Sequence, residues 1–371
     1  MNIPLPDFST DYSAVLERID KVDVTAYNAT RNHLRGAVSY LSPYISRGVV
    51  TLPQVARRIL MKSSPAKAEK FIFELAWREY FQEIWWRESE NIFSDLLRPQ
   101  EMVEYNGVPS AIIHANTGID AVDAGINGLY QTGYMHNHLR MYIASLCCNI
   151  GRYHWLKPAT WMHYHLLDGD LASNMLSWQW VAGTFSSKKY YCNQENINRY
   201  TGSAQRGTFL DADYEALSMM DIPGILRKSE IPHYELPAAS APTELSASEK
   251  ILLYTPYHLD PEWRKEEKGL RILWFNTEHL HKFPISPRVY TFILDLASQI
   301  EGINIMHCSP ETVQSLIKSA TVLSRRHAYI KDLIGITLDC DDRLFPGIEV
   351  KGNSFMGFWK KCEKNLTALS K

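Results

Sequence analysis

The chain has 371 residues, of which 45% are hydrophobic and 22% are charged, so it is long enough to form two or three folded domains. Its net charge of −2 argues against a broadly basic nucleic-acid-binding surface, and any contact with DNA must come from a local group of residues. The six cysteines form no CxxC pair, and no stretch approaches the roughly 20 apolar residues that a membrane span requires. These features predict a cytoplasmic protein with reduced thiols, no bound metal and no membrane contact.

The first part of the chain is predicted to be mostly helical. Segments 67–89 and 133–150 carry apolar and aromatic residues at intervals of three and four, which is the period of an amphipathic helix. Loops rich in Gly, Pro, Asn and Asp separate such segments. We therefore expect an all-helical domain over residues 1–230.

The composition changes at residues 231–248, a Pro/Ala/Ser stretch without hydrophobic periodicity that we interpret as a linker. Beyond it, short apolar runs alternate with helices, and the pairs 286–287 and 309–310 each place a Ser cap before a Pro in the first turn. This alternation predicts a small parallel α/β domain over residues 249–371. The expected fold class is mainly α, with an α/β domain at the C-terminal end.

One face of the first long helix mixes a carboxylate, an indole and a guanidinium. Glu74, Trp77, Arg78 and Phe81 are spaced i, i+3, i+4 and i+7, so they lie on the same side of the helix. Two interpretations remain open. The face is either a partly buried ion pair beside a core tryptophan, or the polar and aromatic wall of a pocket.

A second helix places Asn137, Arg140 and Met141 on one face, again at i, i+3 and i+4. His136 and His138 flank the asparagine but point in different directions, which makes a poor metal site. Arg140 is either the structural partner of a carboxylate or part of a binding site. Asp168 would be its partner in the structural case.

The stretch DGDLASNMLSWQWVAG, residues 168–183, combines a polar turn with two indoles. Its two carboxylates could hold sugar hydroxyls or pair with a guanidinium. Trp178 and Trp180 cannot share a helical face, so we expect one to point into the core and the other to line a cavity. Together with the amide of Asn174, the indoles favour a site that stacks a planar ligand.

Five segments, in the same order along the chain, resemble the helical FAD-binding domain of the photolyase and cryptochrome flavoproteins. They are YLSPYISRG, FELAWREYF, TGIDAVDAGINGLYQTGYMHNHLRM, LLDGDLASNMLSWQW and TGSAQRGTFLD. The resemblance extends from about Tyr27 to Asp211, half of the chain. It implies noncovalently bound FAD, and a short form without the antenna domain that usually precedes the helical domain.

The resemblance implies two groups of cofactor-binding residues. At the FAD phosphates, hydroxyls and backbone amides meet anionic oxygens; this group comprises Tyr27, Ser39, Leu41 and Ser42. The group around the flavin and its ribityl chain comprises Arg140, Asp168, Gly169 and Asp170. Asn174 corresponds to the position beside flavin N5, where a neutral amide resembles photolyase chemistry because it can accommodate the N5 proton.

The same resemblance implies a pocket for a flipped cyclobutane pyrimidine dimer. Trp77 and Trp180 would be its apolar walls, and Glu74, if protonated through burial, would donate a hydrogen bond to the dimer's radical anion. Gln205 matches a glutamine that contacts DNA. The remaining residues placed around the dimer are Arg78, Asn137 and Met141.

Trp178 and Trp155 match the proximal and middle members of the tryptophan chain that reduces flavin in light. The chain departs from the family at the distal position, which is Met102, with Tyr105 nearby. His138 stands where a basic residue is usual, and Tyr134 where tryptophan is common. The iron–sulfur branch of the family is excluded because residues 1–237 contain three cysteines, and that cluster needs four.

The resemblance implies light-driven repair of pyrimidine dimers, a carbon–carbon lyase reaction, by a monomer acting on DNA. Single-stranded DNA is the expected preference, because unstacking a base costs less there. The alternatives are a blue-light photoreceptor that keeps FAD without repair, and a flavin-binding scaffold without photochemistry. The segment RILWFNTEHLHKF is faintly similar to the strand and loop that open the family's antenna domain. The C-terminal α/β domain is therefore either related to that domain, or an unrelated or degenerate domain that packs against the helical one.

Overall fold

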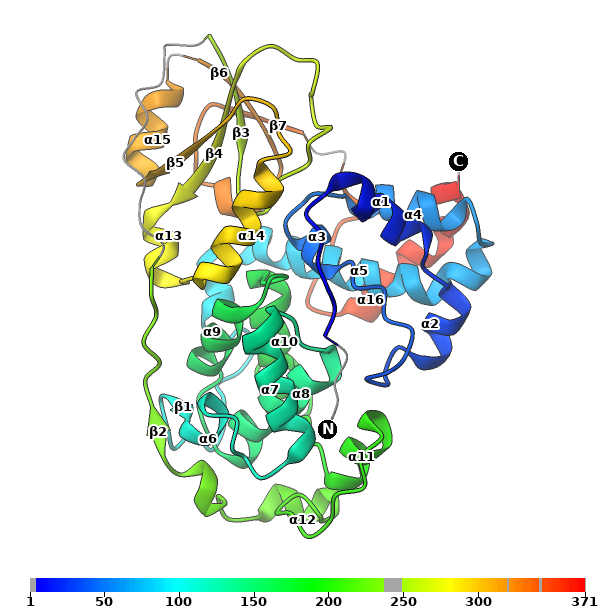
Figure 1. The fold of residues 1–371 in the computed structure, drawn as a ribbon, viewed down its shortest axis with the longest axis vertical. Coiled ribbons are helices and arrows are strands. Elements are labelled where there is room, and N and C mark those ends of the chain that lie inside the picture. The colour runs from blue at the N-terminus through cyan, green and yellow to red at the C-terminus, as the bar shows by residue number, and fades with distance from the viewer. Residues whose placement is uncertain (1–4, 237–248, 319, 340–341, 371) are drawn as a thin grey trace. The chain divides into compact units, whose positions relative to one another are not determined.

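The computed structural model describes residues 5–236, 249–318, 320–339 and 342–370 (Figure 1). The chain forms two compact units. Unit 1 comprises residues 1–7, 29–38 and 90–234, and unit 2 comprises residues 8–28, 39–89 and 235–371. Most of the predicted linker, residues 237–248, lies outside the described residues. The domain boundaries at 230 and 249 stay a prediction.

Unit 1 is predominantly helical, and its two short strands, β1 and β2, pair antiparallel. No helix in the described part of the chain is long and apolar enough to cross a membrane. The elements of unit 1 are η1 (Ser89–Phe93), β1 (Val108–Pro109), α6 (Ser110–Ile113), α7 (Asp120–Thr132), α8 (Asn137–Ser145), η2 (Leu146–Ile150), α9 (Leu156–His165), α10 (Leu171–Ala182), α11 (Gln194–Thr201), α12 (Tyr214–Met219), η3 (Gly224–Leu226) and β2 (Ser229–Glu230).

The helix predicted over 133–150 begins later than expected. Gly133 has φ 72° and its N–H bonds to the carbonyl of Leu129, so it terminates α7 instead of starting the next helix. The side chain of His136 accepts a hydrogen bond from the N–H of His138 and caps α8, which then continues into the π-helical turn η2. This start places Asn137 at the first turn of α8.

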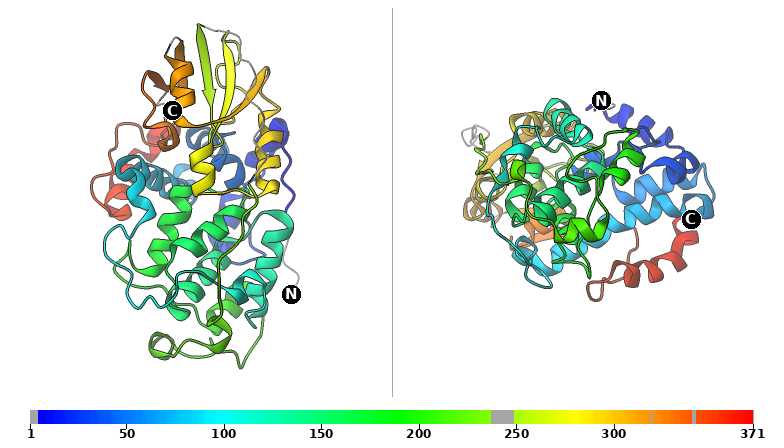
Figure 2. Two further views of the ribbon diagram at one scale, coloured as in Figure 1. Left: turned by 90° about the vertical axis from the view of Figure 1, so that its left-hand side faces the viewer. Right: turned by 90° about the horizontal axis from the view of Figure 1, so that it is seen from below.

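The helical part of unit 2 contains the predicted helix over 67–89, observed as α5. The C-terminal helix α16 packs beside α5 (Figure 2), and the ring of Phe355 stacks on Trp77 with centroids 3.6 Å apart. The helices of this part are α1 (Tyr12–Asp20), α2 (Val24–Thr30), α3 (Ser42–Ser46), α4 (Leu52–Leu60), α5 (Pro65–Glu88), α16 (Phe355–Cys362) and η5 (Glu363–Ser370).

The predicted parallel α/β arrangement is confirmed. Ser286 and Ser309 cap their helices as expected, each accepting a hydrogen bond from the N–H three residues later. The strands are β3 (Lys250–Tyr254), β4 (Leu270–Asn276), β5 (Ile303–Cys308), β6 (Thr321–Arg325) and β7 (Ile336–Asp339), joined with α13 (Thr277–Lys282), α14 (Pro287–Ala297), α15 (Pro310–Ile317) and η4 (Ala328–Ile330).

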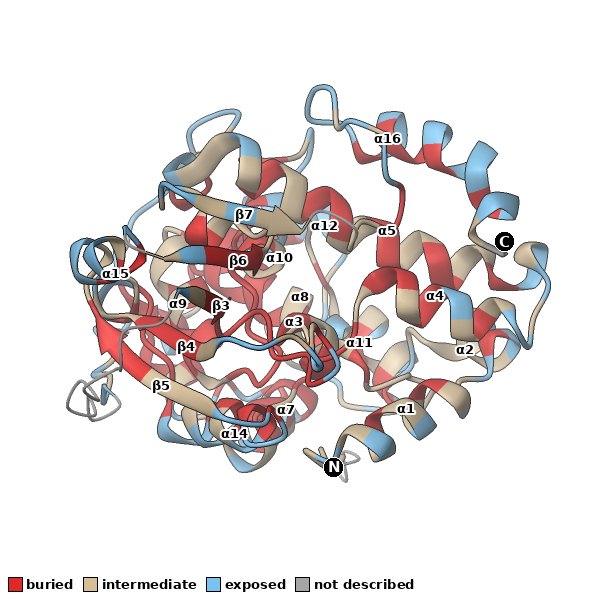
Figure 3. Ribbon diagram, turned by 90° about the horizontal axis from the view of Figure 1, so that it is seen from above, coloured by how far each residue is buried: buried red, intermediate tan, exposed pale blue. Residues whose placement is uncertain are grey.

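The five strands lie in the order β5-β4-β3-β6-β7, and all neighbours are parallel. Leu252 pairs with Arg271 of β4 on one side and with Leu323 of β6 on the other. Burial is highest in the central strands β3, β4 and β6 and lower in the edge strand β7 (Figure 3). From β3 the chain adds β4 and then β5 on one side of the sheet. It then crosses back to add β6 and β7 on the other side of β3, so the winding direction reverses between β3 and β6. Sheets of this kind open a crevice at the carboxyl ends of those two strands.

Glu79 of α5 holds the segment that follows β7. Its carboxylate accepts hydrogen bonds from the backbone N–H groups of Leu344 and Phe345. Burial raises the pKa of Glu79 to about 7, although the two backbone hydrogen bonds oppose the shift. The folded protein therefore binds this proton more tightly than the unfolded chain does.

We expect the free energy of unfolding to fall by about 2–4 kcal/mol as the pH rises from the ordinary glutamate range through the raised pKa of Glu79. The stabilising contribution is fully present below the unfolded pKa, because the proton bound in the folded state is then retained. Glu79→Gln resembles the protonated acid and should flatten this dependence. Urea unfolding at a series of pH values measures it, and an equal slope in both proteins would contradict the assignment.

Candidate functional site

A cavity of about 100 Å³ lies in unit 1 among α8, α9 and α10. Residues from two separate sequence motifs meet there, as the suggested pairing of Arg140 with Asp168 requires. The predicted residues that line it are Asn137, Arg140, Met141, Asp168, Asp170, Asn174 and Trp178. Six further residues line the cavity and were not among the predicted site residues, namely Ala144, Met162, Leu166, Ser173, Ser177 and Val181.

Arg140 and Asp168 form the ion pair that the sequence suggested. Nη2 of Arg140 lies 3.0 and 2.8 Å from the two carboxylate oxygens of Asp168, and Nε donates to the carbonyl of Met135 at 2.8 Å. Asp168 is buried. Hydrogen bonds between charged groups are stronger than neutral ones, so the pair fixes a guanidinium and a carboxylate at the cavity wall.

Gly169 and Asp170 shape the turn between α9 and α10. Asp170 caps α10 by accepting a hydrogen bond from the N–H of Ser173 at 2.7 Å. Gly169 does not line the cavity; a Cβ on it would lie 2.9 Å from the carbonyl oxygen of Leu166, so the close turn needs glycine. Its local role is to let the chain turn between the two aspartates.

The two indoles of α10, Trp178 and Trp180, do not have the environments that were expected. Trp178 is 2% exposed and itself lines the cavity, whereas Trp180 is 39% exposed, lies near Tyr190 and is absent from the lining. The expected separation of the indoles is confirmed, and Trp178 is the buried indole. The expectation that the other indole lines the cavity is wrong here, because Trp180 is absent from the lining. Residues two apart on a helix point about 200° apart, so one cavity cannot take both.

The amide of Asn174 is oriented by the neighbouring helix. Its Nδ2 donates to the carbonyl of Ala159 at 2.9 Å, which leaves Oδ1 without a hydrogen-bond partner among the described residues. The adjacent hydroxyl of Ser173 is buried and likewise has no partner in the described part of the chain. The cavity therefore presents hydrogen-bonding groups that a ligand could satisfy.

Trp155 is fully buried outside the cavity lining. Its Nε1–H donates to Oδ1 of Asp95 at 2.7 Å, and Nε2 of His154 lies 3.4 Å from the same oxygen. Tyr105 stacks on Tyr153 with ring centroids 4.8 Å apart. Met102, at the distal position, is exposed. A carboxylate thus contacts the indole that was predicted to carry electrons.

Gln205, the predicted contact to DNA, has an internal role in unit 1, and His138 does not supply the usual basic residue. Oε1 of Gln205 accepts from the N–H of Asp120 at 2.9 Å, and its Nε2 donates to the carbonyl of Gly118 at 2.8 Å, so the amide holds the start of α7. Burial lowers the pKa of His138 to about 4, with Arg31 adding to the shift. His138 is consequently neutral near pH 7 and does not replace a cation. The ring of Tyr134 lies 5.7 Å from the guanidinium of Arg140.

The predicted phosphate-binding residues belong to unit 2, apart from this cavity. The ring of Tyr27 packs edge-on against Phe71 at 5.0 Å, and Leu41 is buried at the start of α3. Ser42 is the first residue of that helix. Ser39 lies in the segment before it.

The predicted face of α5 also belongs to unit 2. Glu74 is ion-paired with Lys70 at 3.2 Å, and Nη1 of Arg78 donates to the hydroxyl of Ser46 at 3.1 Å. The shared face is confirmed by Trp77 and Phe81, whose ring centroids are 5.3 Å apart. These contacts agree with the structural interpretation of this face, and they leave a pocket role as a prediction.

Residues 71–214 match the family model described as the FAD-binding domain of DNA photolyase. A deoxyribodipyrimidine photo-lyase of Vibrio cholerae is 32% identical over 192 residues, which cover 48% of this chain and 40% of the relative. A cryptochrome DASH of Natronomonas pharaonis is 28% identical over 194 residues, covering 48% of this chain and 40% of the relative. A crystal structure of a Synechocystis cryptochrome has a TM-score of 0.49 and 25% identity, with 53% of this chain and 44% of that chain covered.

Residues 71–214 are thus similar to the FAD-binding domain of DNA photolyase, and this match supports FAD as the cofactor. The chain spans less than half the length of these curated relatives. The cavity suits part of such a cofactor. Oδ1 of Asn174 and the hydroxyl of Ser173 have no hydrogen-bond partner among the described residues, and they match the N–H and carbonyl groups at the edge of a flavin ring.

Proposed function

We propose that this protein repairs cyclobutane pyrimidine dimers in DNA in a light-driven reaction that uses reduced FAD. The observation that carries the proposal is the cavity of unit 1, where residues predicted to hold the flavin adjoin residues predicted to meet the lesion. Asn137 and Met141 belong to the second group, and Asn137 Nδ2 lies 3.9 Å from the sulfur of Met141. The similarity to photolyases of other organisms supports the same reaction class.

Residues of α8, of α10 and of the turn before α10 would hold the cofactor by complementary polar groups. Arg140 and Asp168 provide one cation and one anion in fixed geometry, and the amide of Asn174 offers its oxygen as an acceptor. Reduced FAD, when bound, supplies the electron that excitation makes available to the dimer. An acceptor beside the flavin favours an N–H at that position, and so favours the reduced form that repair requires.

The indoles of unit 1 would supply electrons to the cofactor. Trp178 lies at the cavity wall, and Trp155 is buried with a carboxylate on its N–H group. A negative charge beside an indole stabilises the cation left behind when the indole loses an electron.

Asp95→Asn keeps an acceptor for the Trp155 N–H but removes the charge. We expect flavin photoreduction to slow by about tenfold, because a hydrogen bond to a charged group exceeds a neutral one by about 1–1.5 kcal/mol. Transient absorption after a blue flash measures the rate. An unchanged rate in a variant that still binds FAD would show that Trp155 does not carry the electron.

The second candidate function is that of a photoreceptor that binds FAD without repair. It is favoured by the stack of Phe355 on Trp77, which covers a face of the indole expected to pack against the lesion. The neutral His138 and the internally bonded Gln205 point in the same direction, because both weaken contact with DNA. The two candidates differ in one measurable property, namely repair by the reduced protein.

The deciding experiment illuminates the chemically reduced protein with a thymine-dimer oligonucleotide, single-stranded or duplex, and measures repair per absorbed photon. An absorption spectrum before and after blue light establishes bound flavin first. Repair that is faster on single strands is the expected result. A protein that binds and photoreduces FAD but repairs neither substrate would be a photoreceptor.

Glu74 variants test the lesion side of the proposal. Glu74→Ala should lower repair by up to roughly 10- to 150-fold, the equivalent of one charge-assisted hydrogen bond of about 1.5–3 kcal/mol, with Glu74→Gln in between. Lys70→Ala is the matched control, because it removes the ion pair of Glu74 and keeps the carboxyl group. Equal repair in Glu74→Ala and Lys70→Ala would assign Glu74 to the structural pair alone.

A further inference from the structure

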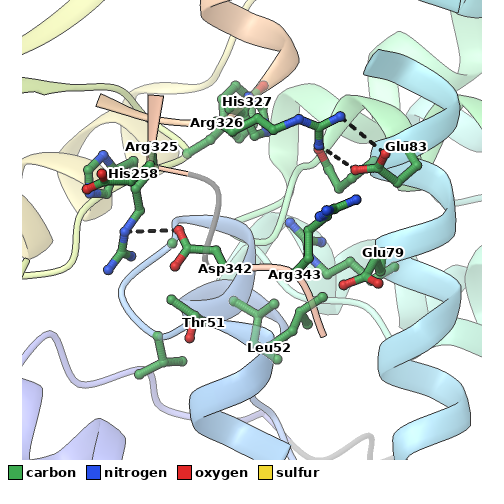
Figure 4. Close-up of a pocket in the computed structure, with 17 residues that line it drawn as sticks. Thr51, Leu52, Glu79, Glu83, His258, Arg325, Arg326, His327, Asp342 and Arg343 are labelled. Carbon is green, nitrogen blue, oxygen red and sulfur yellow. Dashed lines mark hydrogen bonds and ion pairs between the residues drawn. The ribbon is translucent and has the colours of Figure 1, made fainter. Parts of the chain in front are cut away.

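Unit 2 contains a second cavity, of about 120 Å³, at the carboxyl edge of its parallel sheet (Figure 4). Its lining comes from the segments that follow the strands flanking the reversal of winding: His258 follows β3, and residues 325–327 begin at the last residue of β6. Arg343 enters from the segment after β7, opposite Glu79 and Glu83 of α5. Open α/β sheets bind their ligands at this place in the topology.

His258 is the first sign that the cavity takes a ligand. The side chain is 2% exposed, and neither ring nitrogen has a hydrogen-bond partner among the described residues. Its ring is held between Tyr254, with centroids 4.8 Å apart, and Trp263, at 4.4 Å. Burial and nearby cations keep the pKa of His258 well below its usual range, so the neutral ring offers one donor and one acceptor. Leaving both unsatisfied costs free energy that a ligand would recover.

Arg343 is the second sign. Two other arginines of the cavity are neutralised: Arg325 by Asp260 and Asp342 at 2.7 and 3.0 Å, and Arg326 by Glu83. The Nε of Arg343 is buried without a hydrogen-bond partner in the described part of the chain.

The carboxyl group of Glu79 lies near enough for Arg343 to influence it, but Glu79 is already engaged by two backbone N–H groups. A guanidinium with an unused donor therefore faces the cavity.

We propose that this cavity binds a small organic oxyanion, a carboxylate or a phosphate monoester, whose charged group contacts Arg343 and whose other end bonds to His258. The size of the cavity sets the size of the ligand: an engineered protein cavity of about 150 Å³ holds benzene, so a ligand of roughly ten non-hydrogen atoms or fewer is expected. The segment after β3 reads TPYHLD and lacks the glycine-rich phosphate loop that dinucleotide sites use, which favours a small ligand over a dinucleotide. The inference does not depend on the flavin.

The test titrates the full-length protein with inorganic phosphate, glycerol phosphate or succinate, against sodium chloride at equal ionic strength, and follows the melting temperature and the heat of binding. At least one of the three should bind saturably. Arg343→Gln should weaken its affinity roughly ten- to hundredfold, the effect of losing a charge-assisted hydrogen bond. Arg288→Gln, at an exposed position on α14 of the same unit, is the matched control and should change nothing.

His258→Phe separates a ligand-binding histidine from a structural one. Phenylalanine fits the same aromatic surroundings, and the free protein loses no hydrogen bond, so its melting temperature should stay the same or rise while the affinity falls. A large drop in melting temperature with unchanged affinity would overturn the proposal. So would the absence of saturable binding by all three probes, which would mean that the cavity holds water only, or equal affinities in Arg343→Gln and Arg288→Gln.

Discussion

Arg140→Ala is expected to lower the free energy of unfolding by about 3 kcal/mol and to abolish FAD binding. The carboxylate of Asp168 would stay buried after losing both of its hydrogen bonds to Arg140, and removing one partner of a buried ion pair is costly. The cavity would also lose the cation that fixes its polar wall. Stability and cofactor binding should therefore fall together.

Urea unfolding and the ratio of flavin to protein after gel filtration measure the two effects. Arg199→Ala is the control, since Arg199 forms an exposed i,i+4 pair with Glu195 and should be worth only a few tenths of a kcal/mol. If Arg140→Ala kept a full complement of FAD while losing stability, the ion pair would be structural and the proposed contact with the cofactor wrong.

Trp178→Phe is expected to abolish rapid photoreduction of the bound flavin. Trp178 is the indole of α10 at the cavity wall, and phenylalanine keeps an aromatic ring there but is far harder to oxidise. FAD content should change little, and repair by the chemically reduced variant should persist because the dimer reaction does not need this donor.

Trp180→Phe provides a matched control on the same helix, because Trp180 is exposed and outside the cavity lining. Flash photolysis of the three proteins should show slow reduction in Trp178→Phe alone. Equal rates in all three would mean that electrons reach the flavin from another donor, and Tyr105, stacked on Tyr153, would be the next residue to replace.

Local spacing predicted much of the cavity in unit 1. The i, i+3, i+4 pattern placed Asn137, Arg140 and Met141 together, and opposite charges predicted the partner of Arg140. Ser before Pro correctly marked the starts of α14 and α15. Each of these features depends on residues within a few positions of one another, or on a simple charge match.

Other features depend on neighbours that sequence spacing does not reveal. The periodicity of α10 separates Trp178 from Trp180 but does not tell which side faces a cavity. The charge of His138 is set by its burial beside Tyr200, whose ring lies 4.8 Å away. The sequence gives little signal for strands β6 and β7, because TVLSR and ITLD are short and partly polar. Gly133 before α8 was a usable signal for a helix end.

The stack of Phe355 on Trp77 has a consequence for biosynthesis. The aromatic face of α5, which includes Phe73 and Tyr80, is covered by rings of α16 that leave the ribosome long after α5 has been made. Until then, this face is exposed to solvent or to other chains, and contacts between distant segments form slowly. A chain that ends before residue 355 would have complete N-terminal helices and still be unable to bury their aromatic face, and exposed apolar surface of this kind favours aggregation.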